Sequence, residues 1–303
     1  MGSEMCIRDR LLLGPTGTGK TVTVRKIIED FRDVKGMVIY TVCHGTSYTT
    51  LVDLAEHIIR KRLWGYSFNK VWRMFMEATK DKPLMVILDE IDKIVLPGKG
   101  DELLYFLSRR PLTCIIAISN RLNVYEYIRD QRVRSSFVPR TIFFPPYTAE
   151  ELREIVRYRV EEAFEPGTIS EDVISFVAAL AAKRGGDARY AIDLLRFSAE
   201  VAIREGSRKI TIEHIKKARQ EVEADYIIRG ISELHEPQKL LLSIITEKRV
   251  ITISELVQAY NKIAVEPLSS RRISDYISQL ELLGYVKIFR KGMGRAKGVS
   301  CLL

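Results

Sequence analysis

Residues 11–21 read Leu-Leu-Leu-Gly-Pro-Thr-Gly-Thr-Gly-Lys-Thr, and this stretch decides the fold of the N-terminal half of the chain. Its three leucines predict a short buried strand, and a helical pattern follows over residues 22–31. Between strand and helix, the pattern GxxxxGK[ST] is filled by Gly14, Gly19, Lys20 and Thr21. A strand, a glycine-rich loop and a helix in this order predict a phosphate-binding P-loop.

This loop has the chemistry to bind a nucleoside triphosphate. Glycines let backbone N–H groups point at phosphate oxygens, and the N-terminus of the following helix adds partial positive charge. We expect Lys20 to contact the β- and γ-phosphates and Thr21 to bind Mg²⁺, so the predicted cofactors are ATP or ADP and Mg²⁺. The residues predicted to surround the phosphates are Gly14, Pro15, Thr16, Gly17, Thr18, Gly19, Lys20 and Thr21. The alternative is a glycine-rich turn that only connects a strand to a helix.

The composition allows two or three domains and points to an acidic partner. The 303 residues include 48 Lys and Arg against 39 Asp and Glu, a net charge of +9, and nucleic acid is the commonest acidic partner. Residues 284–303 hold five basic side chains and no carboxylate.

No apolar run approaches the ~18 residues that a membrane span needs, so no membrane partner is expected. The four scattered cysteines predict reduced thiols of an intracellular protein, without a zinc site.

Strands and helices alternate up to the Pro145-Pro146 pair. After the P-loop strand, short apolar runs predict strands at 37–42, 84–88, 114–118 and 141–144. Helical patterns lie between them, at 49–62, 68–79, 101–108 and 124–129. Five strands separated by helices predict a parallel sheet that is covered on both faces. Residues 1–10 show neither period and are expected to precede the fold.

Two further domains are predicted after the sheet. Helical patterns at 149–164, 170–183, 187–204 and 211–224 predict a small all-helical domain. A polar linker at 230–236 leads to helices at 237–246, 253–260 and 269–283, and then to strands at 285–289 and 299–302 around a glycine-containing turn. Three helices with a basic hairpin predict a winged helix. The predicted domains are 11–147, 148–229 and 230–303.

Polar residues at the ends of predicted strands are candidates for chemistry. The strand at 84–88 runs into Asp89 and Glu90, where one carboxylate can bind Mg²⁺ and the other can polarise a water for attack on the γ-phosphate. Asn120 ends the next strand and can bind the attacking water or a γ-phosphate oxygen. The alternatives are a strand that ends in solvated acids and an ordinary turn asparagine.

Three arginines are candidates for contacting phosphate. Arg132 and Arg134 precede the last strand, and such an arginine can act in trans as a finger on the nucleotide of a neighbouring subunit. Arg189 opens a helix after the Gly185-Gly186 pair, where it can swing onto the nucleotide and report its state. The alternative for Arg132 and Arg134 is that they are ordinary surface arginines.

Together these residues resemble the archaeal replication initiators of the origin-recognition and cell-division-cycle type, AAA+ ATPases with a C-terminal winged helix. The resemblance covers nearly all of the chain after residue 10. Residues 14–21 are similar to the Walker A motif of the family, 88–92 to its Walker B motif, Asn120 to sensor 1, Arg132 to its arginine-finger region and 186–189 to sensor 2. The run Phe-Pro-Pro-Tyr-Thr-Ala-Glu-Glu-Leu at 144–152 is similar to the passage into the lid, and it is the most diagnostic of these stretches.

The resemblance also implies a DNA-contacting insertion, and the chain departs from the family at two places. The insertion would fall at residues 60–72, where basic and aromatic residues alternate; the alternative is a solvated helical pair with its aromatics in the core. Family members carry a segment before the P-loop that helps to hold adenine. This segment is missing here, so we expect this chain to bind ATP more weakly. Val42 precedes the cysteine of the second strand, where relatives often have a polar Asn. With Val42 at this position, we do not expect a polar switch that couples DNA to Glu90.

The main hypothesis is a DNA replication initiator with slow ATPase activity. It would bind double-stranded origin DNA and help to recruit a replicative helicase, together with other initiator subunits. The residues predicted to contact DNA are Arg271, Arg272, Arg290, Lys291, Arg295 and Lys297. The alternatives are an ATP-regulated winged-helix transcription factor and a helicase or clamp loader. The predicted fold class is α/β, an AAA+ P-loop parallel sheet with a helical lid, plus a C-terminal winged helix.

Overall fold

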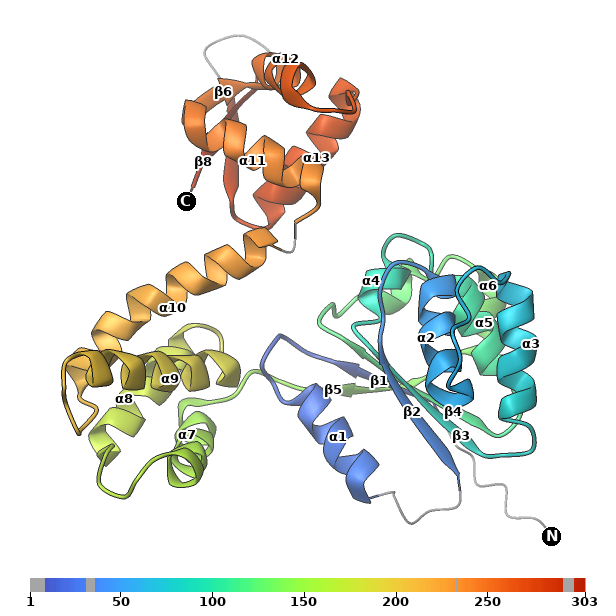
Figure 1. Cartoon of the computed structure of the whole chain (residues 1–303), viewed down its shortest axis with the longest axis horizontal. Helices are drawn as coiled ribbons and strands as arrows, with labels where there is room; N and C mark the ends of the chain where they lie inside the picture. The colour runs from blue at the N-terminus through green and yellow to red at the C-terminus, as the bar shows by residue number, and fades with distance from the viewer. Residues whose placement is uncertain (1–8, 31–35, 233, 291–296, 303) are drawn as a thin grey trace. The chain divides into compact units, whose positions relative to one another are not determined.

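The computed structural model describes residues 9–30, 36–232, 234–290 and 297–302, and Figure 1 labels its helices and strands. The chain divides into two compact units, Met1–Ala218 and Arg219–Leu303. The division falls inside helix α10 (Ile212–Ser232), so this helix contributes residues to both units. Strand β1 (Arg10–Leu13) already includes Arg10, and the backbone oxygen of Asp9 accepts a hydrogen bond from the Arg140 N–H, so the fold begins before Leu11.

The first unit is organised around a parallel sheet. Its strands in the described part of the chain are β1, β2 (Met37–Val42), β3 (Leu84–Asp89), β4 (Thr113–Ser119) and β5 (Arg140–Phe143), and they lie in the order β2-β3-β4-β1-β5. The register pairs Leu13 with Ser119 and Val42 with Asp89. Because the strands are parallel, the P-loop, Asp89 and Ser119 reach the same edge of the sheet.

The two faces of the sheet carry different apolar clusters. Leu11 and Leu13 point into the larger cluster with residues of helices α2 (Ser47–Ile59), α3 (Phe68–Ala78) and α5 (Asp101–Arg109). Leu12 points to the other face, where it packs with Val24 of helix α1 (Lys20–Asp30). Figure 1 shows α1 apart from α2, α3 and α5. Successive strand residues therefore face opposite helices, which confirms the predicted sheet with both faces covered.

The helices between the strands differ from the predictions in three places. The helix predicted at 49–62 ends at Ile59, because Arg60 adopts a left-handed conformation with φ 58°. The helix predicted at 124–129 is a 3₁₀ turn, η1 (Val124–Tyr127), which is followed by the unpredicted helix α6 (Gln131–Ser136). The short helix α4 (Asp92–Val95) was also not predicted. The elements η1, α6 and α4 are short, and apolar periodicity gives little signal for elements of this length.

The predicted helical domain consists of α7 (Ala149–Ala163), α8 (Glu171–Lys183), α9 (Ala188–Arg204) and the first part of α10. Thr148 and Glu151 form a capping box at the start of α7, and the Asp187 side chain caps α9. Ile215, Ala218 and Val222 of α10 are fully buried. We call the helices that follow β5, up to Ala218, the lid.

Helix α10 is longer than predicted. It runs to Ser232, and α11 (Glu236–Lys248) begins four residues later, so much of the predicted linker is helical. Gly230 begins the predicted linker, but in the structure it lies inside α10, and the Tyr285 hydroxyl occupies the space that a Cβ would need at this position. A packing requirement therefore accounts for this glycine inside a helix.

The second unit contains the predicted helices and hairpin and one further strand. Helices α11, α12 (Ile253–Ile263) and α13 (Ser270–Leu282) surround a core that includes Leu241, Ile245, Ile273 and Ile277. Within the described residues the antiparallel sheet has the order β6-β8-β7, with β6 (Val250–Thr252), β7 (Val286–Arg290) and β8 (Lys297–Cys301). Helix, strand, helix, helix and a final hairpin are typical of a winged helix.

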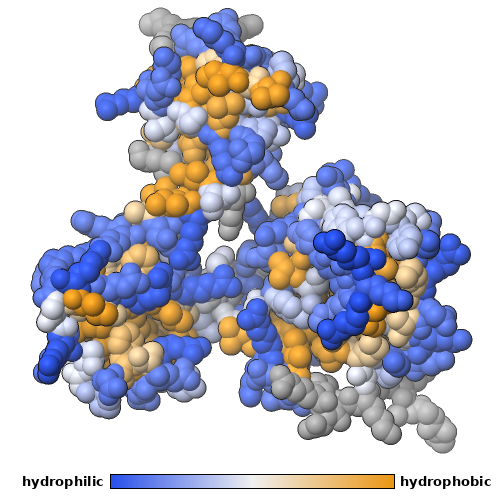
Figure 2. Space-filling view, in the orientation of Figure 1, coloured by the Kyte–Doolittle hydropathy of each residue, from blue (hydrophilic) through white to orange (hydrophobic). Residues whose placement is uncertain are grey.

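The visible surface of each unit is mostly hydrophilic, with smaller apolar groups between the polar side chains (Figure 2). Across the described ranges, none of the helices combines the length and the apolar character that crossing a bilayer would require.

Candidate nucleotide site

The P-loop connects β1 to α1 and holds its lysine against its own backbone. Gly17 and Gly19 have φ values of 76° and 86°, which side chains other than glycine rarely adopt. The Nζ of Lys20 donates hydrogen bonds to the carbonyls of Gly14 (2.7 Å) and Pro15 (2.6 Å). Burial lowers the pKa of Lys20, and the positive charge of Arg189 lowers it further. Phosphate oxygens would replace two carbonyls as partners of this ammonium.

Asp89, at the end of β3, lies next to the P-loop threonine. Its Oδ2 accepts hydrogen bonds from Thr21 Oγ1 (2.9 Å) and from the Tyr40 hydroxyl (2.7 Å), and its Oδ1 accepts one from the Glu90 N–H (2.9 Å). Burial and the contact with Asp89 raise the pKa of Tyr40 to about 12. A hydroxyl and a carboxylate in contact supply the hard oxygen ligands that Mg²⁺ prefers, so the two predicted metal ligands fit this ion.

Glu90 and Asn120 follow neighbouring strands and line the same cavity as the P-loop. Glu90 has φ 54°, and its Oε2 forms an ion pair with Lys93 Nζ at 2.5 Å. Asn120 is exposed, whereas the preceding Ser119 is buried and donates a hydrogen bond to Asp92 Oδ1 (2.7 Å). The end of β4 is thus connected through Asp92 to the segment that carries Glu90.

The lid contributes Arg189 to this cavity and touches the P-loop directly. The Ala188 N–H donates to the Gly17 carbonyl (3.2 Å), and the Asp187 carboxylate lies so close to Gly17 that a Cβ there would overlap it. Asp187 Oδ1 also accepts the Arg189 N–H (2.8 Å), which fixes the start of α9. Arg189 itself is exposed and lies near enough to Lys20 to affect its pKa.

The cavity has a volume of about 450 Å³ and a charged and an apolar side. The charged side consists of residues predicted from the sequence, among them Lys20, Asp89 and Arg189. The apolar side was not predicted, and its residues are Val22, Ile118, Tyr147, Ile155, Tyr158 and Ile192. Val22 and Tyr158 are 65% and 57% exposed, so this apolar side is open to solvent where the cavity reaches the surface.

Arg132 and Arg134 have different environments on a second face of the sheet domain. The Asp130 carboxylate accepts hydrogen bonds from Arg132 Nε (3.1 Å) and Nη2 (2.7 Å), and the guanidinium carbon lies 4.9 Å from the centre of the Tyr105 ring. Arg134 donates instead to the backbone carbonyls of Ile128 (2.7 Å) and Glu126 (2.9 Å). Both arginines are exposed, but Arg134 is bonded to the backbone of the loop before α6, whereas Arg132 is paired with a side chain.

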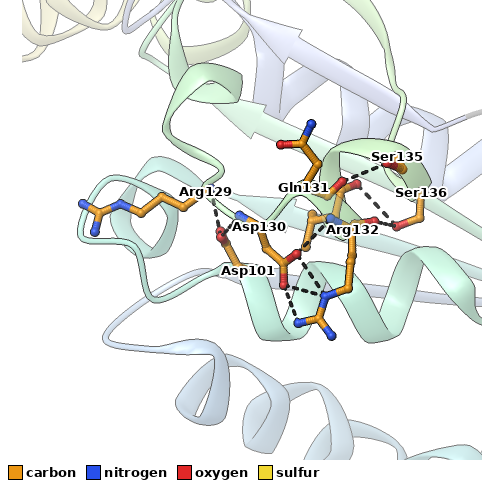
Figure 3. Close-up of polar contacts among 8 residues, drawn as sticks. Asp101, Arg129, Asp130, Gln131, Arg132, Ser135 and Ser136 are labelled. Atoms are coloured by element: carbon orange, nitrogen blue, oxygen red, sulfur yellow. Dashed lines mark hydrogen bonds and ion pairs between the residues drawn. The ribbon is translucent and has the colours of Figure 1, made fainter.

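Figure 3 shows how the segment that carries Arg132 is held. Asp101 Oδ2 accepts the N–H groups of Arg129 (2.9 Å) and Asp130 (2.7 Å), and Asp130 then reaches the Arg132 side chain. Within the described part of the chain, Arg132 is absent from the lining of the nucleotide cavity; it lines a separate groove with Tyr105 and Asp130. The structure therefore does not bring Arg132 to the P-loop of its own chain.

The aromatic and basic segment at 60–72 divides between core and surface. Phe68 and Trp72 pack against the core of the sheet domain, as the alternative prediction required. Trp64 and Tyr66 are 57% and 41% exposed, and Lys70 Nζ lies 3.9 Å from the centre of the Tyr66 ring. A cation over an exposed aromatic ring remains available to contact a nucleic acid backbone.

The residues predicted to contact DNA lie on two elements of the second unit. Arg271 and Arg272 are exposed in the first turn of α13, after the N-cap Ser269. Arg290 ends β7 and Lys297 begins β8, so both belong to the hairpin. Lys291 and Arg295 lie outside the described residues.

Fold and site together define a P-loop ATPase of the AAA class with a helical lid. Residues 10–145 match the model of the ATPase family associated with various cellular activities (AAA), and residues 153–220 match that of the Cdc6 AAA+ ATPase-type lid domain. This match confirms the predicted ATPase class and implies nucleotide binding.

Relatives define the family more closely. The chain is 41% identical over 297 residues to an ORC1-type DNA replication protein of Methanothermobacter thermautotrophicus, covering 96% of this chain and 80% of the relative. Identity to ORC1-type DNA replication protein 1 of Sulfurisphaera tokodaii is 38% over 315 residues, covering 95% of this chain and 79% of the relative. The solved structure of the Aeropyrum pernix ORC1 protein in complex with DNA matches with a TM-score of 0.82 and 32% identity. The match covers 97% of this chain and 83% of the solved chain. The chain belongs to the family of ORC1-type DNA replication proteins.

Proposed function

We propose that this protein is a replication initiator that binds ATP and Mg²⁺ in the cavity at the P-loop and hydrolyses the nucleotide slowly, as a switch. The observation that carries the proposal is the meeting of Lys20, Thr21 and Asp89 in one cavity that Arg189 borders from the lid. Lys20 would exchange its loop carbonyls for β- and γ-phosphate oxygens. Thr21 and Asp89 would hold Mg²⁺, which supplies positive charge to the phosphates when bound.

The remaining polar residues of the cavity have roles in hydrolysis. Glu90 polarises the attacking water once its carboxylate leaves Lys93, and Asn120 orients that water or a γ-phosphate oxygen. Arg189 contacts the phosphates from the lid and reports the state of the nucleotide. Arg132 acts in trans on the nucleotide of a neighbouring initiator subunit. Asp130 occupies two of its five N–H donors, so the other donors can bind phosphate.

Nucleotide state is proposed to control binding to origin DNA and recruitment of the replicative helicase, at the nucleoid in the cytoplasm. The division of work follows the predicted domains: 11–147 binds nucleotide, 148–229 is the lid, and 230–303 binds double-stranded DNA. Support comes from the two arginines in the first turn of α13, from the basic residues that end β7 and begin β8, and from the related Aeropyrum pernix protein, whose structure is a complex with DNA. The exposed Trp64, Tyr66 and Lys70 provide a second contact with the DNA backbone.

Two experiments test the proposal. Lys20→Ala should abolish binding of a fluorescent ATP analogue, whereas Lys26→Ala, which removes an exposed lysine of the same helix, should bind it like the unmutated protein. Footprinting should show protection of origin DNA at concentrations that leave promoter DNA unprotected. Equal affinity of Lys20→Ala and the unmutated protein for ATP would refute the assignment of the site, and protection of promoters alone would favour a transcription factor.

A further inference from the structure

Asp89 has a hydrogen-bond partner that lies outside the motifs of the P-loop and of β3. Its Oδ2 accepts the Tyr40 hydroxyl at 2.7 Å in addition to Thr21 Oγ1 at 2.9 Å. Tyr40 belongs to β2, which is the parallel neighbour of β3. The contact therefore joins strands that are 49 residues apart at these two positions.

The register of the two strands explains why Tyr40 reaches this carboxylate. Tyr40 lies opposite Ile87, and Asp89 is two residues further along β3, so all three side chains point to the same face of the sheet. This is the face covered by α1, where the Arg25 guanidinium carbon lies 5.7 Å from the centre of the Tyr40 ring. The Tyr40 ring is half-buried between sheet and helix, so few positions are open to its hydroxyl.

We propose that Tyr40 is a positioning residue, whose hydroxyl holds the Asp89 carboxylate in the orientation that faces Thr21 and thereby increases the affinity of the site for Mg²⁺. The inference rests on the proposed metal site at Thr21 and Asp89. A carboxylate without this partner would rotate more freely about its Cβ–Cγ bond. Ordering it would then cost part of the free energy of metal binding. Partners of this kind typically contribute tenfold or more to metal affinity.

Tyr40→Phe tests the proposal, since it removes one oxygen and keeps the ring. The readout is binding of a fluorescent ATP analogue during a Mg²⁺ titration, so catalytic turnover is not needed. We expect Tyr40→Phe to need roughly tenfold more Mg²⁺ for half-maximal enhancement of binding. Binding of the analogue in EDTA should equal that of the unmutated protein, because the phosphate and base contacts are unchanged.

Two further variants make the result decisive. Tyr48→Phe removes a hydroxyl that accepts the Gly65 N–H in the same unit, and its Mg²⁺ titration should equal that of the unmutated protein. Asp89→Ala should lose most of the Mg²⁺ enhancement. A Tyr40→Phe titration equal to the unmutated one, with Asp89→Ala impaired, would overturn the role of Tyr40 and leave the metal site standing. If Asp89→Ala kept the full enhancement, the metal site and the role of Tyr40 would both be wrong.

Discussion

Glu90 has a backbone conformation that residues with side chains rarely adopt, and an ion pair on its carboxylate. Left-handed backbone at a residue other than glycine costs about 1–3 kcal/mol and concentrates at functional sites. Its pair with Lys93 is solvent-exposed, so its contribution is at most about 1 kcal/mol. The Glu90 carboxylate can therefore leave Lys93 for a water at a small cost in free energy.

Substitutions at this pair should change turnover and leave binding intact. Glu90→Gln should bind ATP normally and lose hydrolysis, by a factor of about 10²–10⁴, because an amide cannot accept the proton of the attacking water. Lys93→Met should raise turnover, by up to about fivefold for a pair worth about 1 kcal/mol. Phosphate release at saturating ATP measures both. Slower release by Lys93→Met would mean that the lysine assists the reaction.

Arg132 and Arg134 are separated by their partners, and a pair of alanine variants should reflect this. Arg134→Ala removes two hydrogen bonds to backbone carbonyls, so the midpoint of thermal unfolding should fall, by the equivalent of about 1 kcal/mol because water can reach this exposed site. Arg132→Ala loses only an exposed pair and should keep the unmutated midpoint. ATP turnover at high protein concentration, where subunits associate, should fall in Arg132→Ala and stay near the unmutated value in Arg134→Ala. If Arg134→Ala were the variant with normal folding and low turnover, Arg134 would be the finger.

Single residues of the site could be predicted where a motif fixes both spacing and strand position. The P-loop lysine, Thr21, Asp89 and Glu90 were found in this way. Tyr40, Tyr158 and Ile192 were missed, because an aromatic or apolar residue in a strand or helix is usually core. Their contribution depends on strand register and on the packing of the lid, which a local pattern does not contain.

At the scale of elements, the strands of the parallel sheet and the lid helices α7 to α9 were predicted close to their observed bounds, whereas three of the shortest elements were missed. The strands at 84–89 and 113–119 and the lid helices carry enough apolar residues to define a period. The elements α4, α6 and β6 have between three and six residues, less than two turns or one short strand. Their positions depend on contacts such as Asp101 with the backbone N–H of Asp130.

Helix α7 should depend on its capping box, and it carries Ile155 and Tyr158 into the cavity. Thr148→Ala removes the oxygen that accepts the Glu151 N–H, which should cost about 1 kcal/mol. We expect a lower midpoint of urea unfolding together with weaker ATP binding, since the apolar side of the cavity becomes less ordered. Thr148→Ser keeps the acceptor and should restore both. Loss of stability with unchanged ATP affinity would indicate that α7 does not contact the nucleotide.

Helix α13 and the hairpin should contribute differently to DNA binding. Lys297→Ala should weaken binding to all sequences and lower the salt slope by roughly 0.9, as expected for one lost phosphate contact. Arg272→Ala should instead relax the sequence preference, at a cost of roughly 1–3 kcal/mol for the preferred site. Lys262→Ala removes an exposed charge from α12 and serves as the control. Titrations at several salt concentrations, with origin and random DNA, distinguish these outcomes.

At the scale of the whole molecule, α10 joins two units with separate predicted tasks. A chain that ends at Gly230 keeps the whole first unit, which ends at Ala218, and most of α10. It should bind ATP like the full chain and lose most of its affinity for DNA. Fluorescence binding and footprinting measure the two properties side by side. Undiminished affinity for origin DNA with the same salt slope would assign DNA binding to residues 60–72.

The contact between Gly17 and Asp187 has a consequence for which substitutions the P-loop tolerates. The motif GxxxxGK[ST] leaves position 17 open, and a phosphate needs nothing from it but a backbone N–H. Here the lid also excludes any side chain at this position, since Asp187 occupies the space of a Cβ. Any other amino acid at this position would therefore distort the loop or displace the lid. An inherited or engineered change at Gly17 would separate the two halves of the ATP site while leaving every phosphate-binding group in the sequence.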